Sequence, residues 1–395
     1  PRIPETDISG KLNVEQIESD LVLAGLVGLQ DPPRAEARAA VNRCQRAGIR
    51  VVMITGDHPD TASAIARELG ILGVGDDVLT GVDLAAMPDA DLAAVIQRIA
   101  VYARVTAEDK LRIVRAWKAR GAVVAMTGDG VNDAPAIKEA SIGVAMGQTG
   151  TEVSKEASDI IITDDNFASI VAAVEEGRAI YDNIRKTLSY LLAGNSAELI
   201  VMLFAALLGW PLPLLPLHLL WINLVTDGLP ALALATDPVD ADVLARPPRD
   251  PNADLLDRDF VQLTLLTGAI TAAVALGAFA VEYLGQGDLG QARDAAFTAL
   301  VIAELCRSFG ARSANRTIWQ MGIFTNMRLF IVVAVSFAIQ ITIHHMGILQ
   351  SLFDIEPLSM QQCLAWTAAG FIPLLALEMR KVVMGRRAIV ASGGR

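Results

Sequence analysis

The sequence contains little of what metal-binding, disulfide-bonded or nucleic-acid-binding proteins depend on. Three of its 395 residues are cysteine, and Cys44, Cys306 and Cys363 are too far apart to form a metal-ligand motif. We therefore expect reduced thiols and neither zinc, haem nor disulfides. Aromatic residues make up only 5%, and 44 acidic residues against 33 basic ones give a net charge of -11. Since no basic run with interleaved aromatic residues occurs, we expect no nucleic-acid partner.

What is abundant is apolar sequence, which divides the chain into two regions. Apolar residues make up 53% of the chain and concentrate after about residue 186. Residues 1–185 alternate short β-branched runs with helical stretches such as residues 33–47, which predicts an α/β domain with a parallel sheet flanked by helices. The runs expected as strands are residues 21–29, 50–54, 101–105, 122–126 and 160–163.

The second region, residues 186–384, contains six apolar segments. A membrane-spanning helix needs about 20 such residues, so we expect an all-α bundle of six transmembrane helices, followed by a tail of residues 385–395. The segment 237–259, which is rich in proline and aspartate, is expected to be an exposed loop. The predicted spans are residues 188–208, 214–235, 261–284, 295–309, 329–349 and 363–379.

The positive charges predict how this bundle crosses the bilayer. Nearly all lysines and arginines of the connecting segments fall on one side, and only Arg293 falls in a loop of the opposite side. The positive-inside rule therefore places both termini and the α/β domain in the cytoplasm. Nothing resembles a cleaved signal peptide. The alanine-rich composition points to a prokaryotic plasma membrane, with the lipid bilayer as a partner.

The most specific motif is the segment MTGDGVNDAP at residues 126–135, which follows the apolar run 122–125. Its glycines permit a sharp turn that brings Asp129, Asn132 and Asp133 to the carboxyl end of a strand, where open α/β sheets bind ligands. Hard oxygen ligands suit Mg²⁺ better than a soft metal. Gly-Asp-Gly alone could be an ordinary turn, but ten residues in this order predict a Mg²⁺-phosphate site.

This segment resembles the hinge motif of the P-type ATPases, ion pumps that pass through an aspartyl-phosphate. Their phosphorylation domain has the haloacid-dehalogenase-like, Rossmann-like α/β fold. Two more segments resemble the family: Thr55-Gly56-Asp57, which follows a strand-like run, and residues 103–110, which match the family's conserved-lysine segment and end at Lys110. Residues 31–34 look like the family's return from the nucleotide domain to the phosphorylation domain.

The resemblance implies roles for these residues. Thr55 and Lys110 would contact the phosphoryl group, Asp129 would hold Mg²⁺, and Asn132 and Asp133 would position phosphate and metal. Gly56 and Asp57 complete the expected catalytic set. Such donors, at about 3 Å, would neutralise the charge of an aspartyl-phosphate. Taken singly, Lys110 could be a solvated helix charge and Thr55 a turn residue.

A second candidate site lies inside the apolar segments. An ionisable side chain at bilayer depth costs at least ~2.5 kcal/mol and marks a functional candidate. The polar residues are spaced three or four apart, so they lie on shared helical faces. We expect no lysine or arginine near them. Together these features predict a site for a hard cation. Each residue taken singly could instead be a contact between helices. The set consists of Asn195, Glu198, Asn223, Thr226, Asp227 and Glu304.

These segments resemble the calcium-transporting branch of the family. Residues 219–230 look like its ion-site helix, and residues 194–198 and 303–306 resemble the two companion helices. The resemblance implies one Ca²⁺ site, and a second, incomplete site formed by Asn223 and Asp227. Mn²⁺, Na⁺ or H⁺ as the transported ion, and one or two ions per cycle, stay open. The first site would consist of Asn195, Glu198, Thr226, Asp227 and Glu304.

Several family features are absent from the sequence, which begins at Pro1. These are the phosphorylated Asp-Lys-Thr-Gly-Thr motif, the actuator domain's Thr-Gly-Glu loop, most of the nucleotide domain and the first four spans. We therefore expect the carboxyl-terminal half of an ATP-driven Ca²⁺ exporter that uses ATP and Mg²⁺, inactive without its amino-terminal half. The helical pattern of residues 167–186 should couple the two sites as one rod. The alternatives are a non-catalytic cation-binding module and a membrane-tethered phosphatase.

Overall fold

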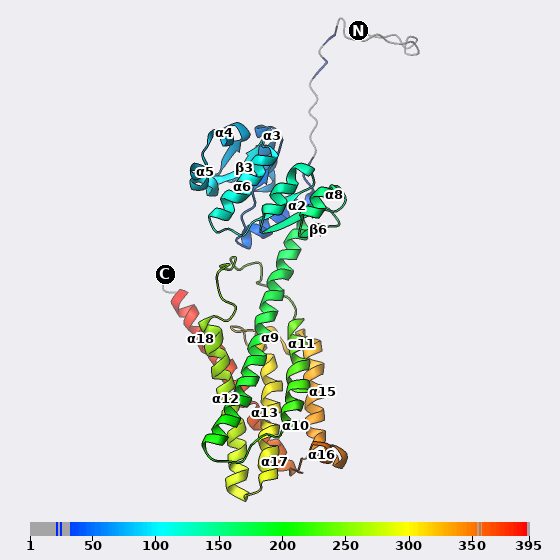
Figure 1. The fold of residues 1–395 in the computed structure, drawn as a ribbon, viewed down its shortest axis with the longest axis vertical. Coiled ribbons are helices and arrows are strands. Elements are labelled where there is room, and N and C mark those ends of the chain that lie inside the picture. The colour runs from blue at the N-terminus through cyan, green and yellow to red at the C-terminus, as the bar shows by residue number, and fades with distance from the viewer. Residues whose placement is uncertain (1–20, 23, 26–31, 354, 357, 393–395) are drawn as a thin grey trace, which may run out of the picture.

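The computed structural model describes residues 21, 22, 24, 25, 32–353, 355, 356 and 358–392. The strand expected at residues 21–29, the segment 31–34 and the tail 385–395 lie partly outside these described residues. Figure 1 shows an α/β domain at one end of the molecule and a helical bundle at the other, joined by one long helix. The two candidate sites therefore belong to two separate bodies of the fold.

The α/β domain contains two three-stranded sheets in which every strand pair is parallel. Strands are confirmed within or overlapping four of the predicted runs, and two strands were not predicted. Of these, β5 contains Gly143 and Ala145, which weaken its β-branched pattern. The first sheet has the order β1 (Met53–Ile54), β3 (Ile99–Ala103), β2 (Asp77–Thr80), and the second β4 (Ala125–Gly128), β5 (Ile142–Met146), β6 (Ile160–Ile162).

Helices connect these parallel strands, and local capping fixes where several of them begin. For example, Thr106 and Asp109 form a capping box in which the Thr106 backbone N–H donates to Asp109 Oδ2 at 2.8 Å, which starts α6 one turn before Lys110. All five residues of β3 are buried between the layers. The helices are α2 (Ala35–Arg46), α3 (Pro59–Leu69), α4 (Gly81–Ala86), α5 (Asp89–Val95), α6 (Ala107–Ala119), α7 (Ala134–Glu139) and α8 (Glu152–Ala157), with 3₁₀ turns at Ile96–Arg98 and Val131–Asp133.

Helix α9 (Phe167–Leu207) connects the α/β domain to the bundle as a single helix of 41 residues. The continuous rod expected from the sequence is therefore present. At its amino-terminal end, Val171 packs in a cluster with Ala40 and Cys44 of α2. Glu175 of α9 accepts a hydrogen bond from Arg43 of α2 at 2.5 Å. These contacts attach the first turns of α9 to the α/β domain.

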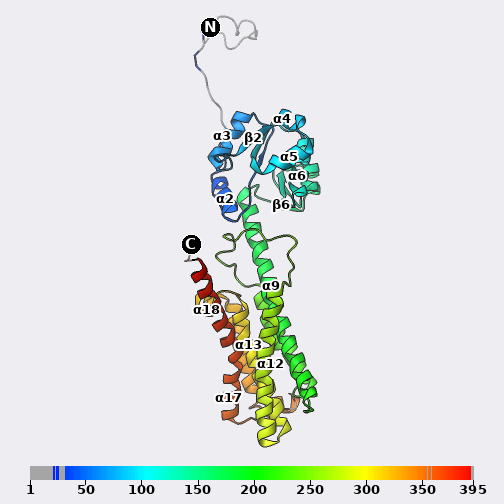
Figure 2. The same ribbon diagram turned by 90° about the vertical axis from the view of Figure 1, so that its left-hand side faces the viewer.

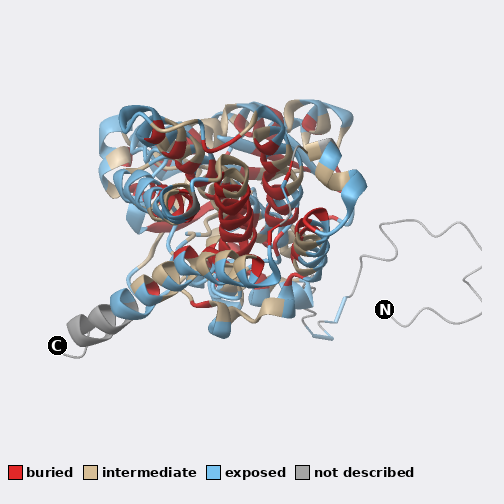
Figure 3. Cartoon of the chain, turned by 90° about the horizontal axis from the view of Figure 1, so that it is seen from below, coloured by how far each residue is buried: buried red, intermediate tan, exposed pale blue. Residues whose placement is uncertain are grey.

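The bundle is arranged around α13, whose residues from Ala292 to Gly310 are almost all buried. Figure 3, which views the molecule from below, shows buried helix at the centre of the bundle and exposed residues around it. The segments of the bundle are α10 (Pro216–Trp221), a π-helix (Ile222–Asp227), α11 (Gly228–Ala235), α12 (Arg258–Gln286), α13 (Leu289–Ala311), α14 (Ile318–Met321), a 3₁₀ turn (Ile323–Thr325), α15 (Met327–Ile343), α16 (Gly347–Phe353), α17 (Met360–Gly370) and α18 (Ile372–Ser392).

By length and composition, four helical segments among the described residues could cross a membrane, against six expected spans. The other two differ for identifiable reasons. Helix α15 has only 17 residues, and α13 contains the charged residues Arg293, Asp294, Glu304 and Arg307. A central helix can carry such charges because its neighbours, not lipid, surround it. The four segments are Phe167–Leu207, Pro216–Ala235, Arg258–Gly285 and Met360–Met384.

The segment that joins α11 to α12 is not simply the exposed loop that its composition predicted. Its Asp237 is buried, because three donors surround the carboxylate: Lys186 Nζ at 3.0 Å, Arg312 Nε at 2.9 Å and Asn326 Nδ2 at 2.8 Å. Figure 2 shows the rest of this segment extending beside α9, between the bundle and the α/β domain. At helix α18 a second difference appears, since the helix continues to Ser392, through most of the predicted tail.

Candidate functional sites

The turn after β4 brings together the first group of predicted site residues. Lys110 of α6 forms a largely buried ion pair with Asp133, with Nζ 2.5 Å from Oδ1. The other carboxylate oxygen of Asp133 accepts the Gly130 N–H at 3.2 Å. A Cβ atom at position 128 would lie 2.4 Å from the Asp133 Cβ, so only glycine permits this close approach. The order Gly-Asp-Gly therefore has a local structural reason, which is to pack Asp133 against the end of β4.

Asp129 and Asn132 have side chains directed outward from the same turn, and both are exposed. The main chain of Asp129 is nevertheless fixed, because its carbonyl oxygen accepts hydrogen bonds from Thr151 N at 2.8 Å and Ser154 Oγ at 3.1 Å. The main chain of the turn is thus fixed by hydrogen bonds, while one carboxylate and one amide remain available to a ligand. Lys110 brings a positive charge to the same turn through its ion pair with Asp133.

Thr55, Gly56 and Asp57 follow β1 and lie at the end of the other sheet. One hydrogen bond fixes the segment against β3, since Thr55 N donates to Tyr102 O at 2.9 Å. A second holds the segment itself, since Thr55 Oγ1 donates to Asp57 Oδ2 at 3.0 Å. Ile54 packs against the cluster that contains Met126 of β4. The two motif-bearing strands therefore lie near each other. Among the described strands they are not hydrogen-bonded to each other, and each has a single neighbour.

The second group of predicted residues converges in the bundle from three segments. Asp227 ends the π-helix and Glu304 lies on α13, and both are almost completely buried. The two carboxylates meet at Gly194 of α9, where an added Cβ atom would lie 3.1 Å from Asp227 Oδ2 and 3.1 Å from Glu304 Oε1. Thr226 Oγ1 donates to Glu304 Oε2 at 3.4 Å. π-Helical turns are rare and occur frequently at functional sites.

The arrangement leaves several buried oxygens without a hydrogen-bond donor among the described residues. Both oxygens of Asp227, Oε1 of Glu304 and Oε1 of Glu198 have no such partner. Oxygens of this kind would bind a hard cation well. Asn223 is exposed, donates to Leu219 O at 2.8 Å and lies within hydrogen-bonding reach of Glu198. Asn195 is exposed and does not join the cluster.

A buried positive charge also lies at this site. Arg307 is almost fully buried, and its Nη2 would lie 3.3 Å from the same added Cβ at Gly194. Its Nη1 donates to Tyr190 O at 3.0 Å, and its guanidinium lies 4.9 Å from the centre of the Tyr190 ring. The expectation of a site without a nearby lysine or arginine is therefore wrong. Arg307 lies three residues, nearly one helical turn, after Glu304, so α-helical spacing was the available signal.

Comparison with known proteins agrees with this two-part geometry. Residues 211–383 match the family described as "Cation transporting ATPase, C-terminus", and residues 5–141 and 111–174 match families described as "haloacid dehalogenase-like hydrolase". The expected combination of a haloacid-dehalogenase-like domain and an ion-pump bundle is present. This chain belongs to the P-type cation-transporting ATPases.

Among its P-type ATPase relatives, the chain is 41% identical to "Calcium-transporting ATPase 1" of Bacillus cereus over 390 residues, which are 95% of this chain and 44% of that protein. It is 45% identical to "Calcium-transporting ATPase" of Bacillus subtilis over 86% of this chain and 38% of that protein. The "Probable cation-transporting ATPase F" of Mycobacterium tuberculosis is 45% identical over 87% of this chain and 38% of its own. The chain thus spans about two fifths of these relatives.

The oxygen donors at the Asp129 turn fit a Mg²⁺ ion that takes further ligands from phosphate and water. Among the described residues, no three His, Cys, Asp or Glu side chains lie close enough together to hold a metal ion. Either candidate site would therefore need further ligands or a movement of its side chains before it could bind a cation. Mg²⁺ commonly uses one or two carboxylates and completes its coordination with phosphate and water. The exposed Asp129 and Asn132 match that requirement. Bound there, Mg²⁺ would neutralise charge on the phosphoryl group.

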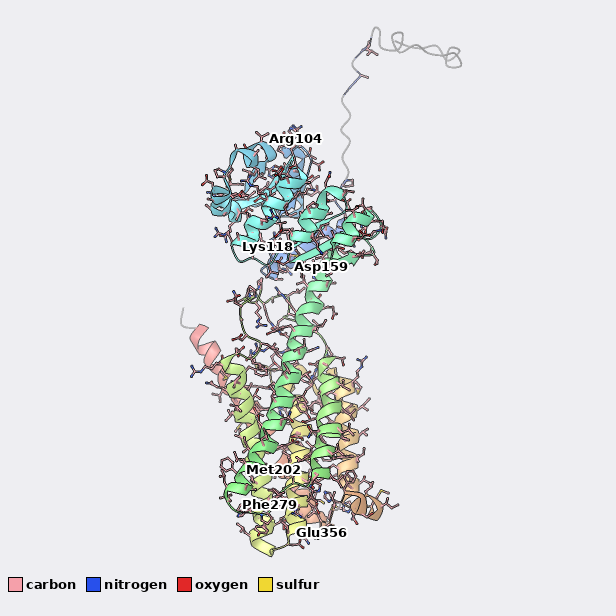
Figure 4. The ribbon with its side chains drawn as sticks, in the orientation of Figure 1. Arg104, Lys118, Asp159, Met202, Phe279 and Glu356 are labelled. Atoms are coloured by element: carbon pink, nitrogen blue, oxygen red, sulfur yellow. The ribbon has the colours of Figure 1, made fainter. Side chains whose placement is uncertain are left out.

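The two candidate sites lie in opposite parts of the molecule and are connected by α9. Figure 4 labels Lys118 and Asp159 in the α/β domain, and Met202 and Phe279 at the far end of the bundle. Gly194, where the buried carboxylates meet, is also on α9, 27 residues after its first residue, Phe167. At 1.5 Å per residue, about 40 Å of continuous helix separates them. A movement of one end of such a rod displaces the other.

Proposed function

We propose that this chain is the carboxyl-terminal part of an ATP-driven Ca²⁺ exporter whose phosphorylated aspartate is carried by an amino-terminal half. The observation that supports this best is the strand arrangement of the α/β domain. Within the part of the chain that the structure describes, strands β1 and β4 each have one neighbour, and their carboxyl ends present Thr55 and Asp129. A strand that ends in the phosphorylated aspartate would place its carboxylate between the two motifs, since parallel strands end on one edge.

In this reading, the chain's own residues bind and orient the phosphoryl group. Lys110 would neutralise phosphate charge, with Asp133 holding the ammonium in place at 2.5 Å. Asp129 would take Mg²⁺, while Thr55 would donate its hydroxyl and Asn132 its amide to phosphate oxygens. Gly56 and Asp57 would maintain the turn. ATP and Mg²⁺ would be needed by the full-length pump, and this chain alone would not turn over.

The charge of the buried cluster supports a divalent cation as the cargo. Glu198, Asp227 and Glu304 would contribute three negative charges when ionised, and Arg307 one positive charge. The difference equals the charge of one Ca²⁺, so the arrangement favours one ion at this site. Thr226 would add a neutral oxygen. The exposed Asn195 and Asn223 would need to turn inward, or to meet helices from the amino-terminal half, before they could take part.

The orientation in the membrane is also part of this proposal. Arginines and lysines from α9, α13, α18 and the joining segments line a cavity of about 680 Å³ at the end of the bundle nearer to the α/β domain. Positive charge gathers on the cytoplasmic side of membrane proteins. We infer that the α/β domain and both ends of the chain lie in the cytoplasm, at a prokaryotic plasma membrane. The lining basic residues include Arg185, Lys186, Arg246, Arg312, Arg316, Arg380 and Lys381.

The test is Ca²⁺-dependent phosphorylation of the full-length pump. The variant Asp227→Ala removes a carboxylate from the cluster and should abolish the phosphoenzyme that forms from ATP in the presence of Ca²⁺. Phosphorylation by inorganic phosphate, which needs only the α/β site, should continue. Asp257→Ala is the matched control, because Asp257 caps α12 and pairs with Arg185 outside the cluster. Normal Ca²⁺ dependence in Asp227→Ala would reject the assignment.

A further inference from the structure

Two adjacent carboxylates connect the Asp129 turn to the start of α9. Asp165 is buried and lies in the left-handed region, with φ of 50°, which a non-glycine residue adopts only where surrounding contacts hold it. Its side chain faces the loop of residues 147–151, which follows β5. Asp164 faces the opposite way, toward the first turn of α9. The pair therefore occupies the junction of the two.

Asp165 fixes the loop through several hydrogen bonds. Its carboxylate accepts the Gln148 N–H at 2.9 Å, the Thr149 N–H at 2.8 Å and the Thr149 hydroxyl at 2.8 Å. These bonds, the Gln148 N–H first, lower the pKa of Asp165 from 3.8 to about 2. The carboxylate is thus held in its ionised form. A charged acceptor with this many donors is a strong and directional anchor.

The anchored loop in turn holds the Asp129 turn. Thr151, at the end of this loop, donates its backbone N–H to the Asp129 carbonyl oxygen at 2.8 Å. The fully buried Ser154 donates its hydroxyl to the same oxygen at 3.1 Å. A Cβ atom at position 150 would lie 1.9 Å from Met146 O, so only glycine allows the loop to lie this close to β5.

On the other side, Asp164 and Asn166 fix the start of α9. Asp164 accepts the Ser169 hydroxyl at 2.7 Å and the Asn166 N–H at 3.1 Å. Asn166 caps the helix by accepting the Ala168 N–H at 2.9 Å. Because Asp165 stands between these two residues, its loop contacts and the first turn of α9 are joined by a single peptide unit on each side.

We propose that Asp165 is a positioning residue that couples the Asp129 turn to helix α9, with Asp164 fixing the helix side of the joint. This inference rests on the proposed pump function. We call residues 164–166 the joint, because a change at the phosphate site would reach α9 through them. The path runs from Asp129 through the loop of residues 147–151 and Asp165 to the first turn of α9. Asp165 itself contacts no substrate. It holds the turn in one position relative to the helix that leads to the ion site.

The test compares two variants of the joint with a matched control in the full-length pump. Asp165→Asn keeps the size of the side chain, but its amide N–H₂ group is itself a donor, so it cannot accept all the hydrogen bonds that the carboxylate accepts. Thr149→Val removes the hydroxyl that donates to Asp165, and it replaces Asp165→Asn in the test if that variant does not fold. Asp159→Asn is the control: Asp159, labelled in Figure 4, accepts the Gly143 N–H at 2.8 Å without touching the loop. Hydrogen exchange and the Ca²⁺ moved per phosphate released are measured for each.

If Asp165 couples the two parts, either variant should affect both the loop and the start of α9. Amide exchange should accelerate by about tenfold, as expected from the loss of a charged hydrogen bond, in residues 147–151 and also in the first turns of α9. The Ca²⁺ moved per phosphate should fall, because phosphorylation no longer displaces α9 fully. Asp159→Asn should change neither. Faster exchange confined to residues 147–151, with an unchanged transport ratio, would overturn the proposal.

The same experiment separates this inference from the proposed function. If the unmodified pump shows no Ca²⁺-dependent phosphoenzyme, the pump assignment fails. The hydrogen-exchange comparison still tests whether Asp165 couples the loop to α9, since it requires only the folded protein. Faster exchange on both sides in Asp165→Asn supports the joint in that case too, and exchange in the loop alone rejects it.

Discussion

The two candidate sites differ in how they exclude water and in how far apart along the chain their residues lie. At the α/β site, Asp129 and Asn132 are exposed, and Lys110, Gly130 and Asp133 act within one turn and its neighbouring helix. In the bundle, Asp227, Glu304 and Arg307 are at most 2% exposed and come from two segments that meet at a third. A site that binds a phosphoryl group and Mg²⁺ from solution must be open, whereas a cation site within a membrane must be enclosed.

The difference also decides what each site tolerates. The exposed carboxylate of Asp129 at the open site is screened by water, so its loss should affect catalysis more than folding. Charge in the bundle is buried among other charges, so its loss should affect stability and ion binding together. The following changes test that contrast in order of expected effect.

The largest effect is expected for Lys110→Ala in the full-length pump. The loss of a positioned donor to developing phosphate charge costs about a hundredfold to a thousandfold in rate. Ca²⁺ binding by the bundle should stay within a factor of about two, because α6 lies far from it. The measurements are phosphoenzyme formation from ATP and equilibrium Ca²⁺ binding.

Lys118→Ala is the control for this change, since Lys118 lies on the same helix and pairs with Glu139, with Nζ 3.1 Å from Oε1. It should leave the rate of phosphorylation nearly unchanged. Equal losses in the two variants would mean that Lys110 acts only on the stability of α6.

The next effect is expected for Arg307→Met, which removes the buried guanidinium and keeps an apolar stem of similar length. Asp227 and Glu304 then repel each other without compensation, which should lower the free energy of unfolding by about 3 kcal/mol. Saturating Ca²⁺ should restore much of this loss, because an ion that binds only the folded state stabilises it. Thermal unfolding with and without Ca²⁺ measures both.

A smaller shift of the unfolding temperature by Ca²⁺ in Arg307→Met than in the unmodified protein would contradict this assignment. Arg312→Met provides a comparison in which another buried arginine is removed, since Arg312 binds Asp237 at 2.9 Å outside the ion cluster. Its loss should destabilise the protein without making stability more dependent on Ca²⁺.

A moderate effect is expected for Gly194→Ala on α9. The new methyl group would lie 3.1 Å from both Asp227 Oδ2 and Glu304 Oε1, so the carboxylates must move apart. Overpacking of this kind costs about 1–3 kcal/mol, which corresponds to a loss of Ca²⁺ affinity of about fivefold to about 150-fold if it falls on the bound state.

Gly177→Ala on the same helix is the matched control, because nothing lies within 4 Å of the added Cβ atom. It should be neutral or slightly stabilising, by up to about 1 kcal/mol, since alanine favours a helix over glycine. Similar Ca²⁺ affinities for the two variants would show that α9 does not approach the ion at Gly194.

The smallest effect concerns acid stability of the α/β domain. Asp165 has a pKa lowered from 3.8 to about 2, chiefly by the hydrogen bond from Gln148 N. Because the folded-state pKa is depressed, its stabilising contribution is complete above pH 3.8 and is lost as the pH falls toward 2. Unfolding followed between pH 5 and 2 should show this loss in the unmodified protein, and a shallower dependence in Asp165→Asn.

Much of the α/β site could be predicted because its determinants are contiguous. The segment from Met126 to Pro135 contains the strand end, the turn and the polar side chains, and hydrogen bonds three residues apart, such as Gly130 to Asp133, hold it. Helix α9 was also predictable, since its periodicity continues without a break. Strands β2 and β5 were not, because short runs with few β-branched residues acquire their conformation from pairing with neighbours.

The sequence by itself determined the family, the two-part organisation and the residue types of both sites, because motifs and long apolar runs depend on neighbouring residues. Only the tertiary structure decided which of these residues meet. It placed Arg307 of α13 near Asp227 of the π-helix, left Asn195 exposed, and buried Asp237 in a segment expected to be an exposed loop. Such contacts join residues far apart along the chain, so they depend on how the helices pack, and helical spacing within one segment cannot specify them.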